Sequence, residues 1–319
     1  MTSIFKTSAL AVLALGTGIG LSAAPVKVDS SIPSYSPASG VSGNLNSVGS
    51  DTLNNLMTFW AEGFRKAYPN VKIQIEGKGS STAPPALIAG SAQIAPMSRE
   101  MKNTEIDAFE KKYGYKPTQI RVALDALSVF VQKDNAVDQL TLAEIDGIFS
   151  KTRRGGGKNI NNWSQVGGSK NPISLYGRNS ASGTYGFFKD NALFKGDYKN
   201  EVKEQPGSAS VVQGVSRDSN GIGYSGMGYK TSGVKALKIA AKAGGDYVEA
   251  SAEGVYSGKY PLKRYLYLYI NKNPNKEADP LVAEFVKYVL SKEGQGVTIK
   301  DGFLPLTAET ASAETGKVK

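Results

Sequence analysis

A repeated order of strand, short polar turn and helix constrains the fold of this chain more than any other feature of its sequence. Residues 71–76 (VKIQIE) alternate apolar and polar side chains, as a half-buried strand does. Residues 53–64 carry apolar side chains at helical spacing, and Pro69 and Asn70 end that helix. Further strands are expected at 45–48, 93–97, 121–132, 173–176, 221–225 and 264–271, and further helices at 83–89, 105–113, 141–149, from about 185, 208–213 and 281–290. This order predicts α/β layers with mostly parallel strand pairing, and 319 residues suffice for about two domains.

The first 24 residues have the features of a cleaved export signal. Lys6 supplies a positive start, residues 9–15 form a short apolar run, and the small residues at 22–24 suit a signal peptidase. The apolar part is too short and too interrupted by glycine for a membrane anchor, and no other stretch approaches a membrane span. Residues 25–44 are rich in Ser, Pro and Gly, which predicts a flexible leader. We therefore expect a periplasmic protein, with secretion as the alternative.

The chain contains no cysteine and no histidine. Their absence excludes a disulfide, a thiolate nucleophile, a zinc site of the Cys/His kind and a Ser-His-Asp triad. Carboxylates, Lys, Arg, Tyr, hydroxyls and backbone amides remain, which favours a binding protein without metal or cofactor over an enzyme. The chain has 38 Lys and Arg against 28 Asp and Glu, a net charge of +10. These cations are scattered along the sequence, so a small anion is a better candidate partner than nucleic acid.

Three turns made of Gly, Ser and Thr share one chemistry. Residues 49–52, 79–82 and 180–184 each follow an expected strand and open an expected helix. Backbone N–H groups without partners and the positive end of the dipole make a helix N-terminus a site for an anion. Ser and Thr are also the favoured helix caps, so any one of these turns alone is as well explained by capping. Arg178, just before the third turn, can bind an oxyanion or form a structural ion pair, and no GK[ST] of a P-loop follows the glycines.

Five segments in this order resemble one protein family. They are GSDTL at 49–53, GSST at 79–82, MSREM at 97–101, GRNSASGTYGFF at 177–188 and NGIGYSG at 220–226. Together they are similar to the periplasmic phosphate-binding proteins of phosphate ABC transporters, the PstS type, over roughly residues 45–310. The segment GRNSASGT is the most specific of the five, because it matches the R-x-x-x-S-G-T pattern of the family.

The resemblance implies an α/β fold of the type II periplasmic-binding-protein kind. Two α/β domains are then joined by two crossover segments, and the ligand lies in the cleft between them. The implied boundaries are 45–125 together with 262–312 for domain I and 126–261 for domain II. We expect the chain to cross near 124–128 and near 258–264.

The resemblance also assigns phosphate-binding positions. They are the backbone N–H groups of Thr52 and Leu53 with the Thr52 hydroxyl, the hydroxyl and amide of Ser80, the Ser98 side chain, the Arg178 guanidinium, and the third group of Ser182, Gly183 and Thr184. Ser98 stands where many members have Asp, so discrimination against sulfate is expected to be weaker. Ser180 stands where an acidic neighbour of the Arg is common, so Arg178 is expected to be less neutralised.

The implied function is high-affinity capture of inorganic phosphate and its delivery to the membrane permease subunits of an ABC transporter, by a monomer without catalysis. The nearest alternative is a binding protein for another oxyanion, such as sulfate, molybdate or arsenate. A secreted phosphatase and a surface adhesion protein are the alternatives from other classes, the latter because the chain has 16 Tyr and a basic balance.

Overall fold

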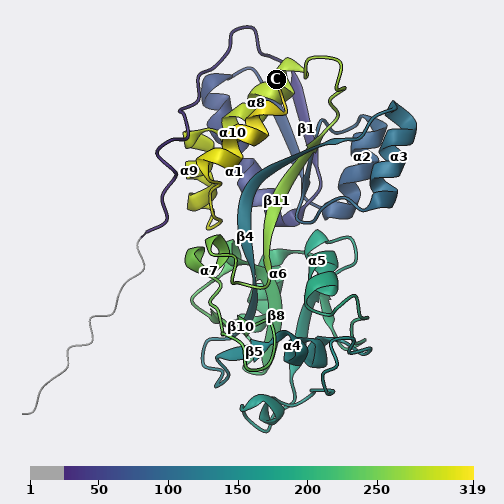
Figure 1. Ribbon diagram of the computed structural model, residues 1–319, viewed down its shortest axis with the longest axis vertical. Coiled ribbons are helices and arrows are strands. Elements are labelled where there is room, and N and C mark those ends of the chain that lie inside the picture. Colours follow the sequence, from purple (N-terminus) through teal and green to yellow (C-terminus); the bar gives the residue numbers. More distant parts are fainter. Residues whose placement is uncertain (1–24) are drawn as a thin grey trace, which may run out of the picture.

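The computed structural model describes residues 25–319, and the expected export signal lies outside the described residues. Figure 1 shows two lobes stacked along the long axis, with two long strands, β4 (Thr118–Gln132) and β11 (Lys263–Ile270), running between them. One sheet continues through both lobes in the order β2-β1-β3-β11-β4-β8-β6-β7. We call the upper part lobe 1 and the lower part lobe 2.

Lobe 1 is built on β1, β2, β3 and the upper parts of β4 and β11, with helices on both faces (Figure 1). Its remaining strands are β1 (Asn44–Val48), β2 (Lys72–Glu76) and β3 (Ile94–Met97). Its helices are α1 (Asn54–Ala67), α2 (Ala83–Ala89), α3 (Asn103–Tyr113), α8 (Pro280–Leu290), α9 (Lys292–Lys300) and α10 (Ala308–Gly316). Short 3-10 turns at Asp51–Leu53 and Ser80–Thr82 lead into α1 and α2. Trp60, Phe64 and Phe285 are fully buried in its core.

Lobe 2 is built on the lower part of β4 and on β6, β7 and β8, around a second core that contains Phe149, Trp163 and Phe188. Its strands are β5 (Gln139–Thr141), β6 (Ser174–Arg178), β7 (Lys203–Gln205), β8 (Gly221–Gly226), β9 (Val234–Ala236) and β10 (Lys238–Ala240). Its helices are α4 (Leu142–Phe149), α5 (Gly183–Asn191), α6 (Ser208–Ser216) and α7 (Ala252–Tyr256), with 3-10 turns at Trp163–Val166 and Met227–Tyr229.

Strand pairing is parallel inside the lobes and antiparallel where the lobes join. β1 pairs in parallel with β2 and β3, and β6 pairs in parallel with β7 and β8. β11 is antiparallel to both β3 and β4, and β4 is antiparallel to β8 and β9. The expectation of mostly parallel pairing is therefore wrong for the joining strands β4 and β11. Each of them runs antiparallel to the strands on both of its sides.

The strand β4 passes from one lobe to the other without interruption. Its first part, up to Ala126, pairs with β11, and residues 127–131 pair with β8. The crossing expected near 124–128 falls in the middle of this strand, and the crossing expected near 258–264 falls between α7 and the start of β11. The exact domain boundaries given above remain a prediction.

The segment expected to be a flexible leader packs against lobe 1 instead. Ile32 is 2% exposed and belongs to the lobe 1 core. The hydroxyl of Tyr35 donates to a carboxylate oxygen of Glu284 on α8 at 2.6 Å, and its backbone N–H donates to Glu293 at 2.7 Å. Asp29 accepts from the backbone N–H of Ala308 at the start of α10. Composition predicted flexibility, but an apolar anchor and three hydrogen bonds hold this segment in place.

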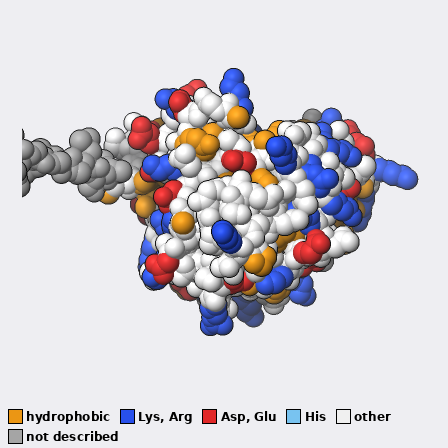
Figure 2. All heavy atoms as spheres, turned by 90° about the horizontal axis from the view of Figure 1, so that it is seen from below, with side chains coloured by type: hydrophobic (Ala, Val, Ile, Leu, Met, Phe, Trp, Pro, Cys, Tyr) orange, Lys and Arg blue, Asp and Glu red, His pale blue; other side chains and the backbone are white. Residues whose placement is uncertain are grey.

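Within residues 25–319, no helix has the length and apolar character needed to cross a membrane. The lower end of lobe 2, seen in Figure 2, carries Lys and Arg with acidic side chains among them. This face therefore lacks the uniform positive surface that nucleic-acid binding requires.

Asp301, which follows the last turn of α9, makes the stability of lobe 1 depend on pH. Burial raises the pKa of its carboxyl from 3.8 to about 6. The folded state therefore holds the proton more tightly than the unfolded chain, and stability falls as the pH rises from below 3.8 through about 6. We expect Asp301→Asn to raise the free energy of unfolding at about pH 8 by about 1 kcal/mol, allowing for solvent screening, with no gain at about pH 3. Chemical denaturation at the two pH values checks this, and an equal gain at both would contradict it.

Candidate anion-binding site

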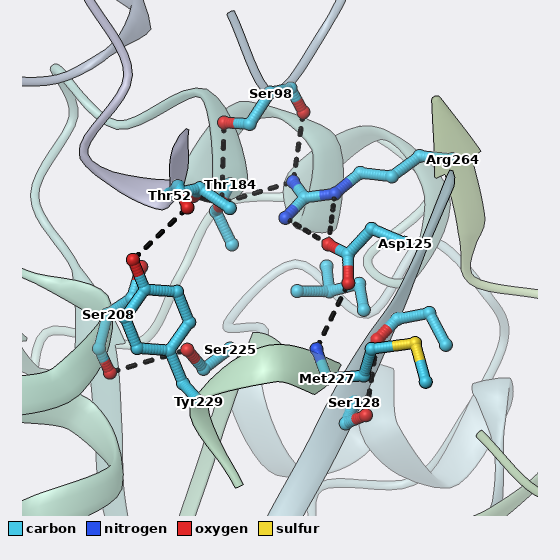
Figure 3. Close-up of polar contacts among 12 residues, drawn as sticks. Thr52, Ser98, Asp125, Ser128, Thr184, Ser208, Ser225, Met227, Tyr229 and Arg264 are labelled. Carbon is cyan, nitrogen blue, oxygen red and sulfur yellow. Dashed lines mark hydrogen bonds and ion pairs between the residues drawn. The ribbon is translucent and has the colours of Figure 1, made fainter. Parts of the chain in front are cut away.

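The three turns singled out in the sequence meet where the lobes face each other. Their hydroxyls, together with that of Ser98, form a group that we call the hydroxyl cluster: Thr52, Ser80, Ser98 and Thr184. Figure 3 shows Thr52, Ser98 and Thr184 of this cluster. The Thr52 and Thr184 Oγ1 atoms lie 2.9 Å apart, and the Ser80 and Ser98 Oγ atoms 3.2 Å apart. All four residues are at most 1% exposed. The cluster thus joins three buried hydroxyls of lobe 1 to one of lobe 2.

Each hydroxyl is positioned by the end of a strand or the start of a helix. Thr52 lies in the turn between β1 and α1, and Ser80 in the turn between β2 and α2. Ser98 directly follows β3, and Thr184 is the second residue of α5. The carboxyl ends of strands in an open α/β sheet are the usual place for a ligand. The topology therefore supports the prediction that these turns lie together.

Close approach of the turns depends on glycine. A Cβ atom on Gly183 would lie 2.2 Å from Ser80 Oγ and 2.7 Å from Ser98 Oγ. Gly79 has a φ of +121°, and a Cβ there would lie 2.5 Å from the carbonyl oxygen of Ala181. The same carbonyl accepts from the backbone N–H of Ser81 at 3.0 Å. The lobes can meet in this way only with glycine at positions 79 and 183.

Arg178, the last residue of β6, brings a buried positive charge beside the turns. It is 1% exposed, its Nη1 donates to Ser208 Oγ at 2.7 Å, and its Nη2 donates to the Pro206 carbonyl at 3.1 Å. Its Nε is buried and has no hydrogen-bond partner within residues 25–319. Burial lowers the pKa of Arg178 below its ordinary value, and Asp51 opposes that shift. A buried donor without an acceptor is costly, so this guanidinium is suited to an anionic ligand.

Asp51 is the acidic partner of Arg178, which the sequence did not predict. Its Oδ2 lies 3.1 Å from Arg178 Nη1 and accepts from the backbone N–H and the hydroxyl of Ser208 at 2.8 and 2.9 Å. Ser180 adds no charge beside Arg178, and the expectation that Arg178 is less neutralised than in other family members stays a prediction, although one carboxylate, that of Asp51, does face it. The compensating carboxylate comes from the other lobe. The hydroxyl of Tyr229 donates to the carbonyls of Asp51 and Thr52 and fixes the same turn.

Ser182 and Leu53 have structural roles within the site. Ser182 is the N-cap of α5, and its Oγ accepts from the backbone N–H groups of Thr184 and Tyr185 at 3.1 and 3.3 Å. Its acceptor capacity is used by its own helix, so only its hydroxyl hydrogen can reach a ligand. The Leu53 side chain is fully buried in the lobe 1 core, which leaves its backbone at the entry of α1 as the part available to an anion.

The capping role of Ser182 gives a direct prediction for stability. Ser182→Ala leaves two N–H groups of α5 without this acceptor, so the free energy of unfolding should fall by about 1 kcal/mol. Ser180→Ala, at an exposed neighbouring position, is the matched control and should be neutral. Denaturant unfolding of both variants measures the difference, and equal stability of the two would argue against the capping role.

Arg264 and Asp125 form a second buried ion pair next to the hydroxyl cluster (Figure 3). Arg264 lies near the start of β11, beside the hydroxyl cluster. Its Nη1 donates to Thr184 Oγ1 at 3.0 Å and to the Ser98 carbonyl at 2.9 Å. The sequence marked Arg264 only as the start of a strand, since its partners lie 80 to 166 residues away. Within the described part of the chain, no three acidic side chains gather as a metal site would require.

Comparisons with known proteins agree with this geometry. The PBP superfamily domain matches residues 35–293. The phosphate-binding protein PstS of Pseudomonas aeruginosa strain PAO1 is 56% identical over 302 residues, which is 93% of this chain and 94% of that protein. Protein SphX of Synechococcus elongatus is 32% identical and covers 85% of this chain and 80% of its own length.

A solved structure leads to the same family. A protein of Clostridium perfringens, described as a phosphate ABC transporter substrate-binding protein and solved with bound phosphate, superposes with a TM-score of 0.72. It is 27% identical and covers 83% of this chain and 100% of its own. The α/β periplasmic-binding-protein fold expected from the sequence is thereby confirmed. This chain belongs to the PBP superfamily and, within it, to the PstS family of phosphate-binding proteins.

Proposed function

We propose that this protein captures inorganic phosphate between its two lobes and delivers it to the permease of a phosphate ABC transporter. The observation that carries the proposal is the buried Arg178 guanidinium, whose Nε lacks a partner within residues 25–319, next to helix starts and hydroxyls. A dehydrated oxyanion needs many donors and a compensating charge, and this region supplies both. The name of the relative that is 56% identical supports phosphate as the anion.

The proposed binding residues are those predicted from the sequence, with their roles refined by the geometry. Thr52, Ser80, Ser98 and Thr184 supply hydroxyls, and Arg178 supplies charge. Leu53 and Gly183 supply backbone N–H groups, and Ser182 its hydroxyl hydrogen, at the N-termini of α1 and α5. Ligand binding would then be coupled to the meeting of the lobes, because the Thr52–Thr184 and Asp51–Ser208 contacts both cross between them.

Another oxyanion is the second candidate, and one observation favours it. Ser98 takes the place where a carboxylate would repel a fully ionised anion, and the Oδ2 of Asp51 is engaged by Arg178 and Ser208. A seryl oxygen can accept a hydrogen bond from the O–H of monohydrogen phosphate but carries no charge that rejects sulfate. Sulfate, molybdate and arsenate are therefore the competitors to test. A phosphatase is not supported, because the family consists of binding proteins.

Export to the periplasm, a monomeric state and the permease as partner belong to the same proposal. Phosphate uptake by cells that lack their own phosphate-binding protein, with and without this chain, tests delivery. We expect uptake to depend on the chain. Equilibrium dialysis with labelled phosphate and the competing oxyanions tests the ligand, and retention of sulfate or molybdate but not phosphate would contradict the proposal.

A further inference from the structure

Tyr229 of lobe 2 contacts the backbone of the turn between β1 and α1 in lobe 1. It is the last residue of the 3-10 turn Met227–Tyr229, which follows β8. Its hydroxyl donates to the carbonyl oxygens of Asp51 and Thr52, both at 3.1 Å, so that one O–H is shared between two acceptors. Figure 3 shows this hydroxyl directed at Thr52. A tyrosine of one lobe thus holds two successive peptide groups of the other.

These two carbonyls belong to the peptide groups of two predicted phosphate donors. The Asp51 carbonyl shares its peptide with the Thr52 N–H, and the Thr52 carbonyl shares its peptide with the Leu53 N–H. Both peptides are trans, so each N–H points away from the side on which the carbonyl accepts from Tyr229. Ser50, the N-cap of this turn, makes no capping hydrogen bond with its side chain. The cap therefore does not compete with a ligand for these N–H groups.

A hydrogen bond to a carbonyl changes the whole peptide group. Because the peptide C–N bond has partial double-bond character, electron density drawn towards the oxygen leaves the N–H more positive. Hydrogen bonds that follow one another through such groups strengthen each other, and the effect is larger where little water screens it. The contact of Tyr229 with the two carbonyls should therefore make the Thr52 and Leu53 N–H groups stronger donors to an anion.

Packing and burial fix the Tyr229 hydroxyl as a donor. Its ring packs edge-on against Phe303, with the ring centroids 6.4 Å apart. The preceding Gly228 lies so close to the end of α9 that a Cβ there would be 2.5 Å from the Asp301 carbonyl oxygen. Burial raises the pKa of the Tyr229 hydroxyl above its ordinary value of 10, and the charge of Asp51 adds to that shift. The hydroxyl therefore keeps its proton throughout the physiological pH range.

We propose that Tyr229 is a positioning residue that strengthens the backbone donors of Thr52 and Leu53 for the bound anion. It acts through the two peptide groups and not by contact with the ligand. This inference rests on the proposed function, since it assigns a role at the same site. A residue that only joined the lobes would not make phosphate affinity depend on how strongly its hydroxyl donates, whereas Tyr229 should.

The first test is Tyr229→Phe, which removes the hydroxyl and keeps the ring. Equilibrium dialysis of the full chain with labelled phosphate should show a dissociation constant about 5- to 10-fold higher than that of the native protein. Tyr256→Phe is the matched control, because the Tyr256 hydroxyl also donates from lobe 2 to a lobe 1 carbonyl, that of Pro305, at 2.8 Å. The N–H of that peptide, on Leu306, donates to Gln295 within lobe 1, so this variant should bind phosphate within about twofold of the native protein.

Fluorinated tyrosines at position 229 separate donor strength from packing. Fluorine on the ring makes the phenol a stronger donor with little change in size, and the raised pKa of Tyr229 keeps the hydroxyl protonated. Phosphate affinity should therefore increase in the order phenylalanine, tyrosine, monofluorotyrosine, difluorotyrosine. The difluorinated protein should bind about two- to threefold more tightly than the native protein. This comparison stands even if Tyr229→Phe fails to fold, because the fluorinated chains keep the hydroxyl and the ring.

The outcomes separate the inference from the function on which it rests. Native affinity in Tyr229→Phe, an equal loss in Tyr256→Phe, or an affinity that does not rise with fluorination would leave Tyr229 a structural role only and overturn the inference. A native protein that does not bind phosphate would instead overturn the proposed function.

Discussion

Arg178→Ala is expected to reduce phosphate affinity by about a thousandfold or more, the largest effect of any single substitution considered. The guanidinium is 1% exposed and supplies the compensating charge of the site. Hydrogen bonds from a charged donor contribute about 1.5–3 kcal/mol each, so losing two of them accounts for a change of this size. The variant also leaves Asp51 facing the anion without its partner, which adds repulsion.

Calorimetric titration of the variant with phosphate measures this loss. Arg154→Ala, which removes the same charge from an exposed position of lobe 2, is the matched control and should bind as the native protein does. Arg178→Lys tests geometry separately from charge, because lysine cannot reproduce the planar contacts to Ser208 and Pro206. A phosphate affinity of Arg178→Ala within about threefold of the native value would show that Arg178 does not contribute to phosphate binding.

Gly183→Ala is expected to weaken phosphate by about a hundredfold or more without lowering stability. An added Cβ would lie 2.2 Å from Ser80 Oγ, so the lobes could not meet as they do here. The position is the first of α5, and its φ is not positive, so alanine suits the backbone and should not lower the melting temperature. Loss of binding in a fully stable protein would therefore report on the meeting of the lobes.

Gly186→Ala on the same helix provides the control for this substitution. Its added Cβ would lie 3.4 Å from Arg99 Cδ, an ordinary contact, so native affinity is expected. Small-angle scattering should show that phosphate reduces the radius of gyration of the native protein and of Gly186→Ala but not that of Gly183→Ala. Tight binding and full compaction by Gly183→Ala would mean that Ser80 does not oppose α5 in the bound protein.

Features of the site that are local in sequence were predicted, and features created by tertiary contact were not. Thr52, Ser80 and Thr184 follow from strand–turn–helix patterns within a few residues, and the structure brings them together. Asp51 was part of a quoted turn, but its partner Ser208 lies 157 residues further along the chain. Nothing in a short pattern specifies such a contact. One signal was present, since Ser208 opens a helix in the same way as the three turns.

The same distinction between local and tertiary contacts explains the errors in the fold predicted from the sequence. Their composition predicted that residues 25–44 are flexible, yet Tyr35 forms hydrogen bonds to Glu284 on α8 and Glu293 on α9. The helix α10 has too few apolar residues for a clear pattern, and it is anchored by the ion pair of Glu314 with Arg121 on β4. The antiparallel joining strands depend on where the chain returns, which periodicity along one strand does not encode.

Binding of one phosphate between the lobes, and its release unchanged, can be tested in a single experiment. The phosphate-free protein is titrated in a calorimeter with phosphate and then with sulfate. We expect one phosphate bound per chain, weaker competition by sulfate, and recovery of unmodified phosphate after denaturation. Absence of binding heat with phosphate, together with clear heat for sulfate or molybdate, would contradict it.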